Sequence, residues 1–295
     1  MASIPKNLSG KDLEKLLAAW QPPVSDDPAS GKRLKTSKPV SLQDFKPDAK
    51  PFSTGDKAGD KVLVDTLATE LDTLQNLFYA DRRFKLLVVL QGTDTSGKDG
   101  TVRGVFSKMS PLGVHTASWK APNTDERAHD YLWRIHKMMP GAGEMMIFNR
   151  SHYEDVLVPP VEGWITPEQT AERYAHINDF ERMLTQTGTV ILKFMLHISF
   201  DEQRERLQAR LDDPEKNWKF EMGDLDARKK WPQYQAAYEN LLGATSTPWA
   251  PWTIVPADSK THRNLMIAAV LSETLKKLEL RFPPADPALK SVKVA

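Results

Sequence analysis

Cysteine is absent from the 295 residues of this sequence. Without thiols the protein has no disulfide, no cysteine-ligated zinc, no iron–sulfur cluster and no thiolate nucleophile. Long apolar runs are also missing, because none approaches the roughly 18 residues that a membrane-spanning helix needs. Residues 1–10 contain no apolar signal-peptide core. These absences predict a cytoplasmic protein without membrane partners.

An excess of charge of one sign is missing as well. The 40 Lys and Arg residues balance 39 Asp and Glu residues, which leaves a formal net charge of +1. This balance excludes a uniformly basic surface of the kind that coats nucleic acid, so a site for a polyanion must be local. Hydrophobic residues make up 40% of the sequence, and the chain is long enough to bury a sizeable core.

Three regions differ in composition. Residues 1–59 form a predicted N-terminal arm with one short helix at about 12–20. The proline-rich stretch 21–59 is either an extended arm or a disordered leader. Residues 60–282 form the predicted main domain. Residues 283–295 contain three prolines and predict a loose tail.

The main domain alternates two sequence patterns. Short apolar runs that predict buried strands lie at about 86–90, 114–118, 144–148, 189–198 and 252–256. Helices are predicted between and around them, at about 60–80, 98–109, 123–139, 167–187, 200–211, 231–242 and 260–281. Strands that alternate with helices predict an α/β fold with a parallel five-stranded sheet covered on both faces.

A phosphate-binding loop is predicted directly after the first of these strands. Its sequence is Gly92-Thr93-Asp94-Thr95-Ser96-Gly97-Lys98-Asp99-Gly100-Thr101. Glycines let backbone amides converge on phosphate oxygens, and the N-terminus of the following helix adds partial positive charge. Lys98 supplies a full charge for a terminal phosphate. The alternative is a glycine-rich turn that only caps a helix.

Two carboxylates make this loop unusual. Asp99 stands where the common pattern has Ser or Thr, so the usual hydroxyl ligand for magnesium is missing. Asp94 lies inside the loop, where it would repel phosphates unless a cation lay between them. Asp94 is therefore a predicted Mg²⁺ ligand.

A second polar cluster follows the predicted strand at 144–148. Residues 149–155 read Asn-Arg-Ser-His-Tyr-Glu-Asp, at the strand end where parallel sheets collect ligands. Arg150 is predicted to bridge phosphates, and Glu154 and Asp155 to bind metal, act as a base or hold a nucleobase. The alternative is a helix start in which Ser151 and Glu154 form a capping box.

Two further segments carry basic residues. Arg127 and Arg134 would share one face of the predicted helix at 123–139, facing either the phosphates or solvent. Residues 200–231 are highly charged and predict a lid, at about 205–231, that closes over a charged substrate. An ordinary surface hairpin with ion pairs is the alternative.

Three motifs in order resemble those of the type 2 polyphosphate kinases. They are Gly92-x-Asp94-x-x-Gly97-Lys98-Asp99-Gly100, the run Phe148-Asn149-Arg150-Ser151-His152-Tyr153-Glu154-Asp155, and Asn217-Trp218-Lys219-Phe220 with Asp224. The resemblance covers about residues 40–282. It implies a three-layer α/β/α P-loop kinase core with a helical lid, similar to thymidylate kinase. The second motif looks like that of the class III subgroup, which phosphorylates nucleoside monophosphates and diphosphates.

The resemblance also implies a reaction and residue roles. A phosphoryl group would pass directly between inorganic polyphosphate and AMP or ADP, with GMP and GDP as further candidates and Mg²⁺ or Mn²⁺ as cofactor. Asp94, Lys98 and Arg150 are the implied catalytic residues, and Asp94 also the metal ligand. The implied phosphate-binding residues are Gly92, Thr95, Ser96, Gly97, Gly100, Thr101, Arg103, Arg134, Arg210, Lys216 and Lys219. The implied nucleotide-binding residues are Asn149, Glu154 and Asp155.

One departure and two alternatives accompany this resemblance. Many members have Asp-Arg where this chain has Asn149-Arg150, so the metal is expected to depend on Asp94. A homo-oligomer, either a dimer or a tetramer, is expected. The competing hypotheses are an ATP-dependent nucleoside or nucleotide monophosphate kinase on the same core, and a sensor that binds nucleotide or polyphosphate without turnover.

Overall fold

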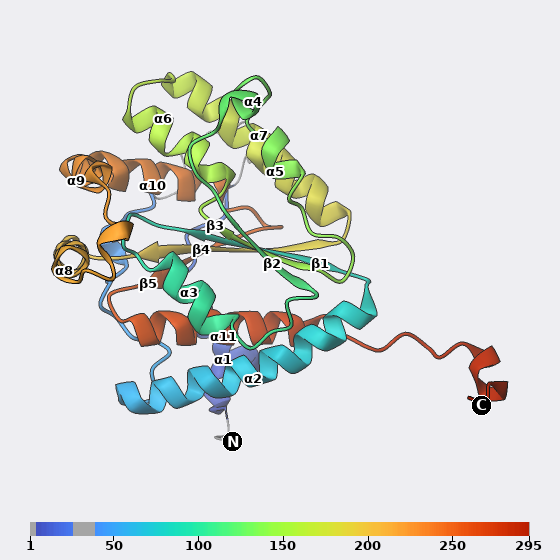
Figure 1. Cartoon of the computed structure of the whole chain (residues 1–295). Helices are drawn as coiled ribbons and strands as arrows, with labels where there is room; N and C mark the ends of the chain where they lie inside the picture. The colour runs from blue at the N-terminus through green and yellow to red at the C-terminus, as the bar shows by residue number, and fades with distance from the viewer. Residues whose placement is uncertain (1–3, 26–38, 295) are drawn as a thin grey trace.

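A parallel β-sheet forms the centre of the protein (Figure 1). The computed structural model describes residues 4–25 and 39–294. Five strands pair in the order β2-β3-β1-β4-β5. They are β1 Lys85–Gln91, β2 Val114–Ser118, β3 Met145–Asn149, β4 Thr189–His197 and β5 Trp252–Pro256. The five predicted strands and their parallel pairing are therefore confirmed.

Helices cover both faces of the sheet. In chain order they are α1 Gly10–Ala18, α2 Lys57–Asp81, α3 Lys98–Val105, α4 Thr124–Arg127, α5 Trp133–His136, α6 Val158–Val161, α7 Pro167–Gln186, α8 Phe200–Asp212, α9 Met222–Lys229, α10 Trp231–Thr245 and α11 Lys260–Lys277. Figure 1 shows α2, α3 and α11 below the sheet and α5, α6, α7 and α10 above it. The predicted three-layer arrangement is confirmed. Across the described residues, no helix has the length and apolar character that crossing a membrane requires.

Strand β1 explains why the sheet has a core on each side. Its alternate residues Leu86, Val88 and Leu90 pack with α2, α3 and α11, whereas Leu87 and Val89 pack with the helices of the other layer. All five side chains are fully buried. A strand covered on both faces needs apolar residues at every position, which is the continuous run that the sequence shows.

The strand register brings the two polar motifs together. Leu90 of β1 lies opposite Asn149 of β3, and Gln91 lies opposite Met195 of β4. The loop after β1, the motif after β3 and the helix α8 after β4 therefore leave the same edge of the sheet. Ligands of open parallel sheets bind at this edge.

The helix predicted at 123–139 is wrong as a single element, because the chain forms the two short helices α4 and α5 there. Asn123 and Glu126 form a capping box that starts α4, which ends after one turn. The Asp130 carboxylate then accepts the backbone N–H of Leu132 at 2.9 Å, and this local turn competes with a continuous helix. Residues 127 and 134 consequently do not share a helix face.

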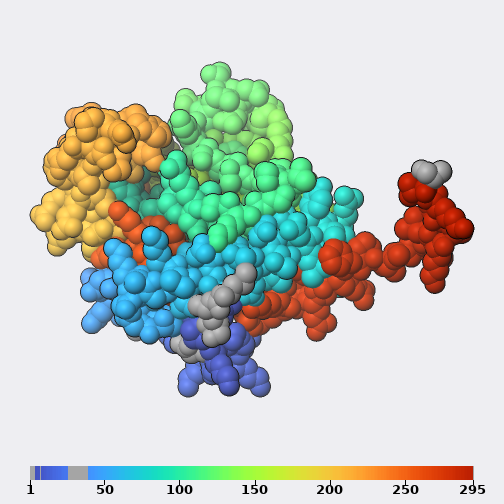
Figure 2. All heavy atoms as spheres, turned by 60° about the horizontal axis from the view of Figure 1, so that its bottom comes forward, coloured from blue at the N-terminus to red at the C-terminus, as the bar shows by residue number. Residues whose placement is uncertain are grey.

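Two other predicted helices are shorter than expected. Helix α3 ends at Val105 and α11 ends at Lys277. The segment predicted to be a lid, about 205–231 and called the lid below, contains the end of α8, the 3₁₀ helix Asn217–Lys219 and α9. Figure 2 shows this yellow and orange lobe beside the green lobe that contains α4 and α5, with a hollow between them.

The segment before α2 packs against the body of the protein, whereas the segment after α11 extends away from it (Figure 1). Part of the predicted arm, residues 26–38, lies outside the described residues. Phe52, which precedes α2, is fully buried, and its backbone N–H donates to His262 Nε2 at 3.0 Å. At the other end, the chain after α11 extends away from the body (Figures 1 and 2). Phe282 there is 70% exposed.

Candidate active site

The loop between β1 and α3 requires glycine at two positions. Gly92 and Gly97 have φ angles of 152° and 103°, which side chains rarely adopt. A Cβ at Gly92 would lie 2.7 Å from the backbone oxygen of Leu196, and one at Gly97 would lie 1.8 Å from Arg263 Nη1. Thr95 also has a left-handed conformation, with φ of 63°. The loop is thus a tightly constrained turn at the start of a helix, as a phosphate cradle requires.

Lys98 is buried at the mouth of this loop. Its ammonium donates to the backbone oxygens of Gly92 at 2.6 Å and Thr93 at 3.2 Å. Burial lowers the pKa of Lys98 to about 8, and the charge of Arg150 adds to this effect. The ammonium is therefore held over the loop, where it can meet the oxygens of an incoming phosphate.

Two arginines donate hydrogen bonds to backbone oxygens of the loop. Arg206 of α8 donates to the oxygens of Thr95 at 2.9 Å and Ser96 at 3.3 Å, and Arg263 of α11 donates to Ser96 at 3.2 Å. These guanidinium groups fix the orientation of the loop carbonyls, while the Ser96 N–H is used inside the loop, where it donates to the Thr93 oxygen at 3.2 Å. Neither arginine is predicted from the sequence to be part of the site. Arg206 looked no different from its exposed neighbour Arg204.

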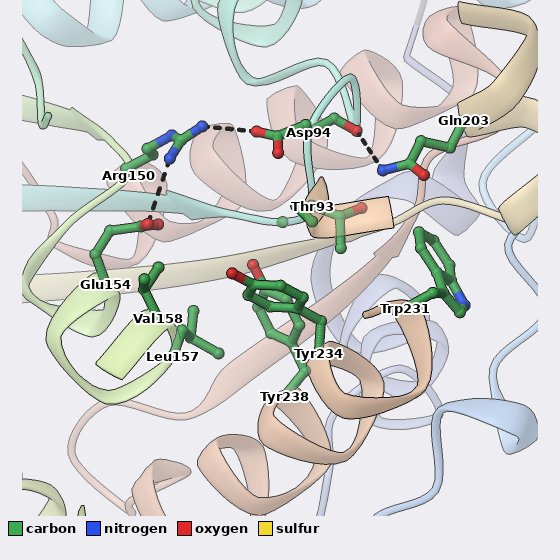
Figure 3. A pocket seen from close by; sticks show the side chains of 12 residues that line it. Thr93, Asp94, Arg150, Glu154, Leu157, Val158, Gln203, Trp231, Tyr234 and Tyr238 are labelled. Carbon is green, nitrogen blue, oxygen red and sulfur yellow. Dashed lines mark hydrogen bonds and ion pairs between the residues drawn. The ribbon is translucent and has the colours of Figure 1, made fainter. Parts of the chain in front are cut away.

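Arg150 joins the two motifs (Figure 3). Its Nη2 donates to Asp94 Oδ1 at 2.6 Å, and its Nη1 donates to Glu154 Oε2 at 3.4 Å. Gln91 donates to the other oxygen of Glu154 at 3.1 Å, and Gln203 donates to the backbone oxygen of Asp94 at 3.2 Å. The predicted residues Asp94, Arg150 and Glu154 therefore meet in one charged cluster.

A pocket opens beside this cluster. Figure 3 shows Arg150, Asp94 and Glu154 at one end, and the aromatic rings of α10 at the other. The further lining residues are Gly92, Thr93, Leu157, Val158, Gln203, Ala227, Trp231, Tyr234 and Tyr238. Burial raises the pKa of Tyr234 to about 12, so this hydroxyl stays neutral at physiological pH. The lining suits in kind a molecule with a flat apolar part and a phosphorylated end. The enclosed volume of the pocket is about 50 Å³, so the pocket must widen to admit such a molecule.

Asp99 links the second motif to the lid. It accepts from Asn149 Nδ2 at 2.7 Å and from Lys219 Nζ at 3.4 Å. Burial alone would raise the pKa of Asp99, but these two donors lower it overall. The carboxylate therefore stays ionised and couples α3, β3 and the lid.

The remaining lid cations have other partners. Arg210 donates to the backbone oxygen of Lys219 at 2.9 Å and to Asp224 Oδ2 at 3.2 Å, which fixes the lid's own turn. Lys216 is exposed and pairs with Asp213 inside the lid. Of the three predicted lid residues, Lys219 is the one whose side chain is paired with the first turn of the loop helix.

Three predicted site residues lie apart from the charged cluster. Arg134 is 7% exposed; it donates to Lys120 O at 2.9 Å and to Glu126 Oε2 at 3.2 Å. The Asp155 carboxylate lies 3.8 Å from Arg134, and burial raises its pKa. Arg103 is exposed on the last turn of α3. The structure does not bring these three residues to the pocket of Asp94.

A divalent cation fits the donor chemistry of this site. In residues 4–25 and 39–294, no three His, Asp or Glu side chains are grouped closely enough to form a complete protein cage. Mg²⁺ usually keeps waters and binds one or two carboxylates together with substrate phosphates. Asp94, inside the loop and partly exposed, offers such a carboxylate. A cation here would therefore arrive with the phosphates.

Comparisons with known proteins place the chain in a family. A profile of the family described as Polyphosphate kinase 2 (PPK2) matches residues 54–283. An AMP/ADP-polyphosphate phosphotransferase from Meiothermus ruber is 48% identical over 251 residues, which cover 85% of this chain and 94% of that protein. An ADP-polyphosphate phosphotransferase from Rhodopseudomonas palustris is 40% identical over 238 residues, covering 77% and 82% of the two chains.

A solved structure extends the likeness to the fold. The crystal structure of Polyphosphate Kinase 2 from Arthrobacter aurescens matches with a TM-score of 0.82 and 42% sequence identity, and the match covers 91% of this chain and 96% of that chain. Both the profile and the relatives extend over most of the chain. The chain with the glycine loop, the Asp94–Arg150–Glu154 cluster and the charged lid therefore belongs to the polyphosphate kinase 2 family.

Proposed function

We propose that this protein transfers phosphoryl groups between inorganic polyphosphate and adenine nucleotides, with AMP and ADP as acceptors. The relatives from Meiothermus ruber and Rhodopseudomonas palustris carry names for this type of activity. The observation that supports it here is the position of Arg150, which connects the loop residue Asp94 to Glu154 in the adjacent pocket. A phosphate in the loop and a nucleotide in the pocket would meet at this guanidinium.

The pocket residues suggest how the two substrates divide the site. The aromatic wall formed by Trp231, Tyr234 and Tyr238 suits a nucleoside, and Glu154 lies at its phosphate end. The loop and Lys98 would hold the end of the polyphosphate chain, with Lys219 of the lid above the first turn of α3. This assignment makes Glu154 the residue that selects the acceptor.

The proposed reaction is a direct in-line transfer. A terminal phosphate oxygen of AMP or ADP attacks the end phosphorus of polyphosphate, and the shortened polyphosphate leaves with the electron pair of the broken P–O bond. That oxygen is already ionised at neutral pH, so no strong base is required. Lys98 and Arg150 stabilise the charge on the transferring group, and catalysis depends mainly on positioning and electrostatics.

The metal would assist at Asp94. Mg²⁺ or Mn²⁺ bound there would neutralise phosphate charge while the chain's own residues orient the substrates. Arg150 is oriented by two carboxylates, and Lys98 by two carbonyls. A cytoplasmic location and assembly into a homo-oligomer stay predictions of this proposal.

The test is an ATP assay with polyphosphate as the donor and with AMP and ADP as separate acceptors. We expect both acceptors to be phosphorylated when Mg²⁺ is present. Phosphorylation of AMP by ATP in the absence of polyphosphate would favour an ATP-dependent kinase. Tight binding of substrates without transfer, under either metal, would favour a sensor. The Glu154→Gln variant should lose AMP phosphorylation more than ADP phosphorylation, and an equal loss would contradict the acceptor role of Glu154.

A further inference from the structure

A charged network lies inside the core, directly behind the pocket. Lys193 of β4 donates from Nζ to Glu181 Oε2 of α7 at 2.7 Å and to the Tyr153 hydroxyl at 2.8 Å. Tyr153 in turn donates to Glu181 Oε1 at 2.7 Å. The side chains of Lys193 and Glu181 are completely buried, and Tyr153 is 0% exposed. Neither the phosphate loop nor the charged cluster includes any of these residues.

The network joins the two walls of the pocket. Tyr153 precedes Glu154 in the 3₁₀ helix His152–Val156, which leads into the lining residue Leu157. Lys193 Nζ also donates to the backbone oxygen of Thr245, at 2.7 Å, at the end of α10. Helix α10 carries the aromatic wall that includes Tyr238. The Lys193 ammonium therefore links two parts of the pocket lining to the same point of the sheet. One is the acidic wall, the segment that carries Glu154, and the other is the aromatic wall on α10.

Stability alone is a poor explanation for this arrangement. A buried ion pair must recover the cost of removing two charges from water, and apolar residues of similar volume often give equal or greater stability. Burial alone would raise the pKa of Glu181, but Lys193 and His152 lower it overall, so the carboxylate stays charged. Unlike apolar packing, hydrogen bonds from one ammonium to three fixed acceptors have defined directions and distances.

We propose that Lys193, Glu181 and Tyr153 are positioning residues that set the distance between Glu154 and the aromatic wall of α10, and thereby the fit of the acceptor nucleotide. The inference rests on the proposed function, because it takes this pocket to be the nucleotide site. The network touches neither the phosphate loop nor the lid, so its loss should affect the nucleotide and leave polyphosphate binding unchanged.

Two variants test the network at different points. Tyr153→Phe keeps the ring and removes the hydroxyl that holds the acidic wall. Lys193→Met combined with Glu181→Gln removes both charges together, so that no unpaired charge stays buried, and releases the carbonyl of Thr245. Ser272→Ala is the matched control, because Ser272 is buried in the opposite layer and the change removes a part-buried hydrogen bond of 3.1 Å to Glu70.

Steady-state kinetics with each substrate varied in turn provide the readout. For both network variants we expect the KM for AMP and ADP to rise about tenfold and the KM for polyphosphate to stay within about twofold, with the control unchanged in both. A lower kcat with unchanged KM values would indicate a merely structural role and would overturn the proposal. If the double variant does not fold, as a thermal melt would show, Tyr153→Phe decides the outcome alone.

Glu154→Gln, measured in parallel, separates the two proposals. If it leaves the KM for both nucleotides unchanged, the nucleotide site has been assigned wrongly and the proposed function must be revised. The other outcome is that Glu154→Gln raises the KM for the nucleotides while both network variants leave that KM within about twofold of the original value. In that case the nucleotide site is assigned correctly and the positioning role of the network is refuted.

Discussion

Asn149 donates a hydrogen bond of 2.7 Å to Asp99, so the end of β3 is in direct contact with the first turn of α3. Asp99 stands where a common phosphate loop has Ser or Thr. The pair contains one amide and one carboxylate, and the carboxylate is on α3. The contact predicts that the two positions are coupled, so that the effect of changing one depends on the other.

A double-mutant cycle tests this coupling. Asn149→Asp alone places two carboxylates within hydrogen-bond distance, and repulsion between them should lower kcat/KM about tenfold. Adding Asp99→Asn restores one carboxylate and one amide, and should recover most of that loss. The measurement is kcat/KM for all four proteins under identical metal and salt conditions. If the two effects simply add, the positions are independent and the interpretation is wrong.

The pH dependence of the reaction should reflect Lys98. Burial lowers the pKa of this lysine to about 8 in the free protein. As the pH rises through that value the ammonium loses its proton, and kcat/KM for polyphosphate should fall about tenfold for each further pH unit. Bound polyanion favours the charged form, so kcat at saturating polyphosphate should fall only at higher pH.

Lys98→Arg is the control for this profile. A guanidinium keeps its charge across the range, so the variant should be slower than the original protein and yet show no decline near pH 8. The same decline in the variant would assign the titration to another group or to the substrate.

The contact behind the loop predicts a steric effect at Gly97. A methyl group there would lie 1.8 Å from Arg263 Nη1, in addition to the strain of a φ angle of 103°. Gly97→Ala should therefore displace the guanidinium from the loop and lower kcat at least about a hundredfold. Gly163→Ala is a matched control, since Gly163 has a φ of 72° and open space around its Cα. Equal effects of the two variants on kcat would contradict the steric argument.

Acid should loosen the segment that precedes α2. Burial lowers the pKa of His262 to about 4, and its neutral Nε2 accepts the N–H of Phe52. Between pH 6.5 and 4 the unfolded chain binds a proton that the folded chain excludes, so this histidine makes stability fall as the pH falls, by about 1 kcal/mol per unit. His262→Gln cannot titrate, and urea unfolding across this range should show a shallower slope for the variant. An unchanged slope would exclude His262 as the source.

Local sequence patterns predicted the sheet and the two motifs at its edge. The continuous apolar run of β1 needs both faces covered, and the loop from Gly92 to Lys98 needs glycine at fixed places, so both features can be recognised from neighbouring residues. The helix at 123–139 was wrong because the side chain of Asp130 satisfies a backbone N–H of the following turn. Such competition depends on a single hydrogen bond that helical periodicity does not reveal.

Residues that act across long sequence separations could not be predicted. Arg263 meets Ser96 at a separation of 167 residues, and Lys193 meets Thr245 at a separation of 52. Neither contact has a fixed spacing, and an arginine or lysine in a helix or strand carries no sign of its partner. Tyr238 was absent from the predicted site for the same reason, since its position in the pocket depends on how α10 packs against the sheet.

Arg206 has a mechanical consequence for the lid. Besides the loop, its guanidinium binds the backbone oxygens of Ala257 at 2.7 Å and Asp258 at 2.8 Å, beyond β5. The first half of α8 is therefore fastened to two neighbouring loops. The turn held by Arg210 and Asp224 lies beyond that point and has its own internal bonds. Arg228 of α9, however, donates back to this first half of α8, to the backbone oxygen of Phe200 at 2.7 Å and to Gln203 Oε1 at 2.9 Å. An opening movement beyond Arg206 would therefore have to break these two bonds and the contact of Lys219 with Asp99, while Arg206 keeps its own hold on the phosphate loop.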